Sequence, residues 1–250
     1  MVPLTQPQAA ALDAIRGAFP DADIVLIGAL ALGRHVEMSH RSTDDLDLAI
    51  AVPMESFAGP IVSLDGWTQH AKMEHRFFSA DGQMVDVLPA SRALVERGYI
   101  EWSSGERMSL VGFDLAFAHH TSEQAGDTAV LVPSAPVLAF LKMRAWLDRP
   151  EMRRKDLADL AHLLVCYVGD DADRRFEGEV LELGMEFEDV SPFLLGRDLA
   201  QLMSAVHRPH VLEFLDRATP EQLTAHGPPS WHSTEHAERA LSCFREGLDE

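Results

Sequence analysis

The chain has 250 residues, of which 46% are hydrophobic and 24% are charged, a composition typical of a folded globular protein and not of a disordered one. Its 21 basic and 40 acidic residues give a formal net charge of -19, which disfavours binding to nucleic acid or anionic membranes unless a local basic patch overrides the field. Two cysteines are too few for a disulfide framework. No stretch is apolar for long enough to span a bilayer, and the first residues lack a signal-peptide pattern, so we expect a cytoplasmic protein.

The first part of the chain predicts a mixed sheet. Residues 7–18 predict a short helix, and "DADIVLIG" predicts an apolar strand that ends on Gly28. A second helix is expected at roughly residues 29–38, and a polar loop then leads to "DLDLAIAV", which alternates as a strand does. The order strand, helix, strand is the opening of an α/β or α+β domain.

A β-hairpin is predicted next, in "KMEHRFFSADGQMVDVLPA". Two strand-like runs flank Asp81-Gly82, a dipeptide that tolerates the positive φ angles of a tight turn. The second of these strands carries Asp86.

From about residue 134 the pattern becomes helical. "SAPVLAFLKMRAWLDR" and "RRKDLADLAHLLVCYV" predict helices, and the remaining segments are mainly helical too. We therefore predict an α+β fold with a mixed sheet domain over residues 1–132 and a mainly helical domain over residues 133–250.

The segment "HRSTDDLDLAI" places carboxylates at the start of a buried strand. Residues two apart in a strand point to one face, so Asp45 and Asp47 project together and repel one another. A divalent cation removes this conflict, and oxygen ligands suit Mg²⁺ or Mn²⁺. Asp86 supplies a third carboxylate if its strand lies beside the first.

Simpler interpretations exist for these patterns. Asp21-Ala-Asp23 has the same spacing in a turn-like context, so a solvated strand entry also explains Asp45 and Asp47. "HSTEH" resembles an inverted zinc-peptidase motif, but the cap of a last helix explains it better.

Taken together, "IGALALGRHVEMSHRSTDDLDLAI", "GQMVDVLPA" and "LKMRAWLDRPEMRRKDLADLAHLL" resemble the nucleotidyltransferase fold, in the branch of the AbiEii/AbiGii abortive-infection toxins. The resemblance covers about residues 24–200. It implies a mixed sheet flanked by helices and followed by a helical C-terminal domain, a nucleoside triphosphate such as ATP or GTP as substrate, and a possible cognate antitoxin.

The same resemblance implies roles for particular residues. The carboxylates expected both to hold metal and to act in catalysis are Asp45, Asp47 and Asp86. The residues expected to bind the nucleotide or support its site are Gly28, Ala29, Arg41, Thr43, Lys142, Lys155 and Asp159. Ala29 departs from the family, which usually has Ser or Gly there, and this removes a hydroxyl that a phosphate could accept from. An exposed ion pair between Lys155 and Asp159 is the structural alternative for these two.

The function expected from this resemblance is Mg²⁺- or Mn²⁺-dependent transfer of a nucleoside monophosphate, with release of pyrophosphate. A tRNA, a protein and a small molecule all stay open as the acceptor, and a patch of Arg144, Arg149, Arg153 and Arg154 is the candidate surface for tRNA. Two alternatives are a non-catalytic nucleotide-binding or toxin-interaction module and an antibiotic nucleotidyltransferase.

Overall fold

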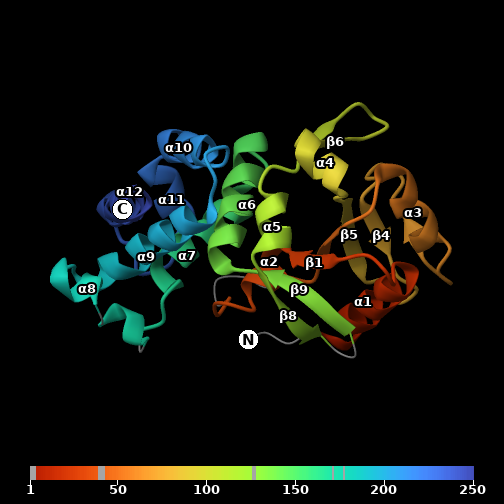
Figure 1. The fold of residues 1–250 in the computed structure, drawn as a ribbon, viewed down its shortest axis with the longest axis horizontal. Helices are drawn as coiled ribbons and strands as arrows, with labels where there is room; N and C mark the ends of the chain where they lie inside the picture. The colour runs from red at the N-terminus through yellow and green to blue at the C-terminus, as the bar shows by residue number, and fades with distance from the viewer. Residues whose placement is uncertain (1–3, 39–42, 126–127, 171, 177) are drawn as a thin grey trace. The chain divides into compact units, whose positions relative to one another are not determined.

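The computed structural model describes residues 4–38, 43–125, 128–170, 172–176 and 178–250. The chain forms two compact units, Met1–Ser134 and Ala135–Glu250. Figure 1 shows the order of their helices and strands along the chain.

The first unit combines short helices with a mixed sheet. Its helices are α1 (Gln6–Ala18), α2 (Gly28–Leu32), α3 (Met54–Val62), α4 (Arg92–Arg97) and α5 (Phe113–Ala118). Its strands are β1 (Ile24–Ile27), β2 (Leu46–Ile50), β3 (Thr68–Gln69), β4 (Arg76–Phe78), β5 (Met84–Pro89), β6 (Tyr99–Glu101), β7 (Arg107–Ser109), β8 (His120–Ala125) and β9 (Thr128–Pro133).

Within the described residues, seven of these strands form one sheet in the order β3-β4-β5-β2-β1-β9-β8, while β6 and β7 pair separately. The central strand β2 pairs antiparallel with β1 and parallel with β5. Helix α1 packs against β9 and α3, and α3 packs against β5. The predicted mixed sheet flanked by helices is thus confirmed.

Alternation along the two neighbouring strands β2 and β5 separates a core face from a polar face. Leu46 and Leu48 on β2, with Val85 and Val87 on β5, have no solvent exposure. The residues that alternate with these along each strand point to the opposite face of the sheet. Asp47 is one of these residues, so the strand holds its carboxylate away from the core that anchors it.

The predicted hairpin is present, with a longer loop than a two-residue turn. Ser79 and Gln83 close it, because Ser79 N–H donates to Gln83 O at 3.0 Å. Gly82 takes the positive φ angle, 78°, and Asp81 does not. This is the pattern of a three-residue loop that ends on a left-handed glycine. It fixes the register that sets Arg76 opposite Asp86.

The helix expected at residues 29–38 is shorter than predicted. Helix α2 spans Gly28–Leu32 and ends at Gly33, where the low helix propensity of glycine favours termination. Residues after Gly33 turn without continuing the helix.

The second unit is helical in the part of the chain that the structure describes. Its α-helices are α6 (Ala135–Asp148), α7 (Arg154–Cys166), α8 (Glu179–Glu182), α9 (Phe187–Leu202), α10 (Arg208–Arg217), α11 (Pro220–His226) and α12 (Thr234–Asp249), with a 3₁₀ turn at Asp173–Arg175. Helix α6 buries residues around most of its circumference, as an internal helix does.

Two glycines allow helices α9 and α12 to approach closely. A Cβ atom on Gly196 of α9 would lie 2.1 Å from the carbonyl oxygen of Phe244. A Cβ atom on Gly247 of α12 would lie 2.0 Å from the carbonyl oxygen of Phe193. At each of these positions the backbone of the opposite helix leaves room for a hydrogen atom but not for a Cβ atom. The packing of α9 against α12 therefore requires glycine at both positions.

Across the residues with described positions, we find no helix with the length and apolar character that crossing a bilayer requires.

Candidate active site

Four strands of the sheet place their residues in one lateral row. Arg76 on β4 lies opposite Asp86 on β5, Asp86 lies opposite Asp47 on β2, and Asp47 lies opposite Ile27 on β1. Directly opposed residues on paired strands point to the same face, and neighbouring strands are about 4.8 Å apart. The two carboxylates are therefore neighbours across the parallel β2–β5 pair.

Arg76 forms a two-pronged ion pair with Asp86. Its Nε and Nη2 atoms donate to Oδ1 and Oδ2 of Asp86, both at 2.7 Å. The hydrogen bonds to Asp86 raise the pKa of Arg76, and the charges of Asp86, Asp45 and Asp47 raise it further against the opposing effect of burial. The negative charges of Asp45, Asp47 and Asp86 thus all act on the guanidinium of Arg76. Asp45 does so from the position just before β2.

Gly28 follows β1 and lies against the carboxylate of Asp47. A Cβ atom on Gly28 would be 2.1 Å from Oδ2 and 2.8 Å from Cγ of Asp47. The φ angle of Gly28 is 71°, which favours glycine in any case. Two independent constraints, backbone conformation and close approach, therefore require glycine at this position. The neighbouring Ala29 is buried, so its methyl group contributes to the core.

Two glutamines hold the backbone before β2. The carbonyl oxygen of Asp44 accepts from Gln83 Nε2 at 2.5 Å and from Gln8 Nε2 at 3.4 Å. Gln83 closes the hairpin loop, and Gln8 belongs to α1 and is buried. The segment that carries Asp45 is consequently fixed by side chains from two other elements.

Sequence reasoning missed Arg76, Gln8 and Gln83. For Arg76 a signal existed, because counting outward from Asp81 pairs Arg76 with Asp86 in an antiparallel hairpin. The glutamines gave no such signal, since an amide that binds a distant carbonyl leaves no periodic pattern.

Of the two loop residues predicted to assist the aspartates, Thr43 is half-buried two positions before Asp45. Arg41 lies outside the described residues.

The predicted lysines belong to the second unit. Lys142 on α6 is buried, and its Nζ atom donates to Asp159 Oδ2 at 2.5 Å and to Asp156 Oδ1 at 3.3 Å. The side chain of Asp159 is fully buried, so the alternative of an exposed ion pair with Lys155 does not hold. Lys155 is exposed on the first turn of α7. Lys142 thus ties α6 to α7 by neutralising two carboxylates.

The carboxylates of Asp47 and Asp86 are oxygen donors of the kind that bind a divalent cation, but with the other residues that the structure describes they do not form a complete set of metal ligands. Oxygen donors are what Mg²⁺ and Mn²⁺ prefer, and Asp47 and Asp86 present them side by side. In the described part of the chain, however, no group of three or more His, Cys, Asp or Glu side chains is arranged to hold a metal ion. Asp86 is bonded to Arg76 instead.

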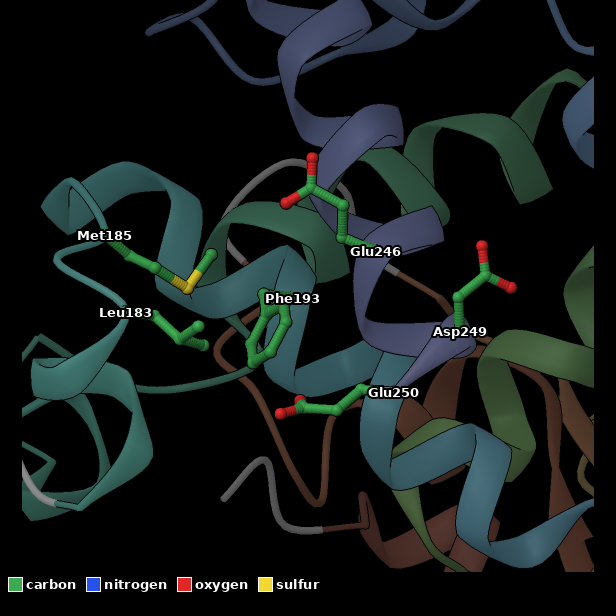
Figure 2. A pocket seen from close by; sticks show the side chains of 6 residues that line it. All are labelled: Leu183, Met185, Phe193, Glu246, Asp249 and Glu250. Atoms are coloured by element: carbon green, nitrogen blue, oxygen red, sulfur yellow. The ribbon is translucent and has the colours of Figure 1, made fainter.

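A pocket of about 440 Å³ lies in the second unit, lined by Leu183, Met185, Phe193, Glu246, Asp249 and Glu250. Figure 2 shows Leu183 and Met185 to the left of Phe193, while Glu246 lies above Phe193, Asp249 to its right and Glu250 below it. The pocket contains none of the residues predicted for nucleotide or metal binding.

Comparison with solved structures finds nucleotidyltransferase-like proteins at low identity. An antigenic nucleotidyltransferase-like protein from Paracoccidioides brasiliensis is 15% identical over 64% of this chain and 76% of its own, with a TM-score of 0.40. JHP933 from Helicobacter pylori is 12% identical over 98% and 94%, with a TM-score of 0.39. A CCA-adding enzyme in complex with ATP is 15% identical over 97% and 52%, with a TM-score of 0.34.

Comparison with curated proteins finds no significant match. The family assignment therefore depends on the sequence pattern, which extends over most of the chain. Residues 10–234 match the family described as "Nucleotidyl transferase AbiEii toxin, Type IV TA system", and the chain belongs to this family of nucleotidyltransferase toxins.

Proposed function

We propose that the chain transfers a nucleoside monophosphate from a nucleoside triphosphate to an acceptor hydroxyl, with Asp47 and Asp86 as the central carboxylates and Asp45 beside them. The observation that supports this most directly is the opposition of Asp47 and Asp86 on parallel strands, with Gly28 against Asp47. Two carboxylates on one sheet face repel one another, and in this structure the guanidinium of Arg76 offsets the charge of Asp86.

In the proposed reaction, the acceptor oxygen attacks the α-phosphorus and forms a new P–O bond. The bond from this phosphorus to the oxygen that bridges to the β-phosphate breaks, and pyrophosphate leaves with the electron pair. Asp86 accepts the proton of the acceptor hydroxyl. Asp45, Asp47 and Asp86 would hold Mg²⁺ or Mn²⁺, whose chemistry is to neutralise the charge of the triphosphate.

The remaining predicted residues receive supporting roles. We assign Gly28 and the backbone of Ala29 to the phosphate side of the site, and Arg41 and Thr43 to the orientation of the aspartate segment. Lys155, which is exposed, is assigned to phosphate contact.

Lys142 and Asp159 have a different role in this proposal. Both are buried and bonded to each other, so we assign them to holding α6 and α7 of the second unit together and not to contact with the substrate.

The experiment that tests this function is incubation of the purified protein with each α-labelled nucleoside triphosphate, Mg²⁺ and a cell lysate. Transfer of label to a macromolecule or metabolite is expected for the natural chain and for Asp81→Asn, an exposed carboxylate in the hairpin loop. Loss of label is expected for Asp47→Asn and Asp86→Asn. Full transfer by Asp47→Asn would rule the proposal out.

The acceptor is a separate question. A net charge of -19 makes an extended RNA surface costly, so a tRNA would have to bind a local patch. Arg153 and Arg154 are exposed at the start of α7. If a tRNA is the acceptor and binds this patch, Arg153→Glu with Arg154→Glu should abolish its crosslinking to the protein; unchanged crosslinking would count against the patch as the tRNA surface.

A non-catalytic nucleotide-binding module is the second candidate, and the ion pair between Arg76 and Asp86 favours it, because this pair occupies both oxygens of the proposed base. Calorimetry that shows nucleotide binding in the presence of Mg²⁺, together with no release of pyrophosphate with any lysate, would support this alternative. Either activity is compatible with a cognate antitoxin as a cellular partner and with a cytoplasmic location.

A further inference from the structure

Arg76 lies at one end of the row of opposed residues, with Asp86 and Asp47 next along it. Its guanidinium carries one positive charge, binds both oxygens of Asp86 and lies in the electrostatic field of Asp45 and Asp47. The side chain of Arg76 is 24% exposed and that of Asp86 is 15% exposed, so the pair is partly accessible to solvent. His75 adds a contact of 4.0 Å from Nε2 to Asp86 Oδ2.

This arrangement creates competition for Asp86. A divalent cation that uses Asp86 must displace two charge-assisted hydrogen bonds, which are among the stronger polar contacts in proteins. The cation would also bring positive charge next to the guanidinium. Arg76 therefore lowers the affinity of the row for a metal ion as long as it stays on Asp86.

A triphosphate can resolve this competition. The planar fork of donors on a guanidinium matches phosphate oxygens as well as it matches a carboxylate. A nucleotide that brings its phosphates to the row offers Arg76 a second anionic partner, and Asp86 is released when Arg76 takes it.

We propose that Arg76 is a switchable positioning residue, which holds Asp86 while no nucleotide is bound and moves to the phosphates of an incoming triphosphate, so that Asp86 becomes free for metal and for the acceptor proton. This inference rests on the proposed function, whose site it shares. Its consequence is reciprocal: triphosphate and metal bind better together than either does alone.

The switch is tested by two binding measurements that require no turnover. The affinity for Mn²⁺ alone is measured from the electron paramagnetic resonance signal of the free ion. The affinity for inorganic tripolyphosphate alone is measured by calorimetry in the presence of a chelator, and this probe does not depend on the nucleotide base.

For Arg76→Gln we expect Mn²⁺ to bind about tenfold more tightly and tripolyphosphate about tenfold more weakly, because the competing ion pair and the phosphate ligand are lost together. Arg76→Lys keeps the charge but lacks the fork, and we expect both shifts in the same directions at about threefold or more. Arg92→Gln removes an exposed ion pair with Glu96 on α4 and should change neither affinity.

The outcomes separate the explanations. If Arg76→Lys keeps both natural affinities while Arg76→Gln shifts them, net charge alone is responsible and the switch is refuted. Unchanged affinities in both variants, with circular dichroism showing a native fold, assign Arg76 a structural role only and also refute it. Opposite shifts in both variants support the switch even if the natural chain labels no acceptor, so the proposed function can fail independently.

Discussion

A Cβ atom placed on Gly28 would lie 2.1 Å from Oδ2 of Asp47, so the backbone at the end of β1 and the carboxylate on β2 share one space. Substitution of this glycine must displace the carboxylate. Gly28 is predicted to lie beside the phosphates and Asp47 is predicted to bind metal, so this contact links the two predicted parts of the site. It can be tested without the other contacts of the site.

Gly28→Ala is expected to abolish nucleotidyl transfer by moving Asp47. It should also lower stability by about 1–2 kcal/mol, because alanine resists a φ angle of 71°. Gly82→Ala is the matched control: its φ angle is 78°, and nothing lies within 4 Å of its added Cβ. We expect urea denaturation to show a loss for Gly28→Ala at least as large as that for Gly82→Ala, and the labelling assay to show inactivity for Gly28→Ala alone. Equal activity of the two variants would contradict the role of this contact.

Lys142→Met is expected to destabilise the second unit by about 3–5 kcal/mol, since it removes the cation bonded to the fully buried Asp159. Lys155→Met, at an exposed position on α7, should change the free energy of unfolding by about 0.5 kcal/mol or less. Chemical denaturation of both variants checks this difference.

Adding Asp159→Leu to Lys142→Met should recover much of the lost stability, because the unpaired buried charge disappears. A double variant as unstable as Lys142→Met alone would mean that the two side chains are not coupled.

Gly196→Ala is expected to cost about 3 kcal/mol or more of stability, because its Cβ atom would lie 2.1 Å from the carbonyl oxygen of Phe244 and would force α9 and α12 apart. Gly17→Ala is the control: Gly17 is also helical, in α1, but nothing lies within 4 Å of its added Cβ, so a gain of about 0.5–1 kcal/mol is expected. Thermal unfolding followed by circular dichroism distinguishes the two.

The cysteines should differ in reactivity. Burial raises the pKa of Cys243 to about 12, and the negative charge of Asp189 adds to this effect, so at pH 8 only about one thiol in ten thousand is ionised. Cys166 is only partly buried. Iodoacetamide at pH 8 should therefore modify Cys166 first, as peptide mass spectrometry can show. Equal rates in the folded protein would contradict the packing around Cys243.

Much of the sheet could be predicted because its signals are local. The apolar run before Gly28, the alternation around Asp47 and the turn at Gly82 each follow from side-chain periodicity and backbone preference within a few residues. The mixed sheet is confirmed, and β5 lies beside β2 as the metal hypothesis required. The chemical roles of Asp45, Asp47 and Asp86 stay predictions.

The contacts that could not be predicted either join residues far apart in the sequence or bury a residue type that is usually exposed. Lysine is mostly exposed in proteins, yet Lys142 is buried because α6 packs around most of its circumference. Gln8 reaches Asp44 across 36 positions of sequence, which no local pattern can reveal. The helix predicted over residues 29–38 is too long for a local reason, because α2 already ends at Gly33.

The most direct test of the account is diffraction from crystals grown with Mn²⁺ and an α,β-methylene nucleoside triphosphate, using the anomalous signal of manganese to place the ion. The account predicts a manganese peak bound by Asp47 and Asp86, with the guanidinium of Arg76 on a phosphate oxygen. A nucleotide bound with manganese elsewhere, while Arg76 still holds both oxygens of Asp86, would contradict it.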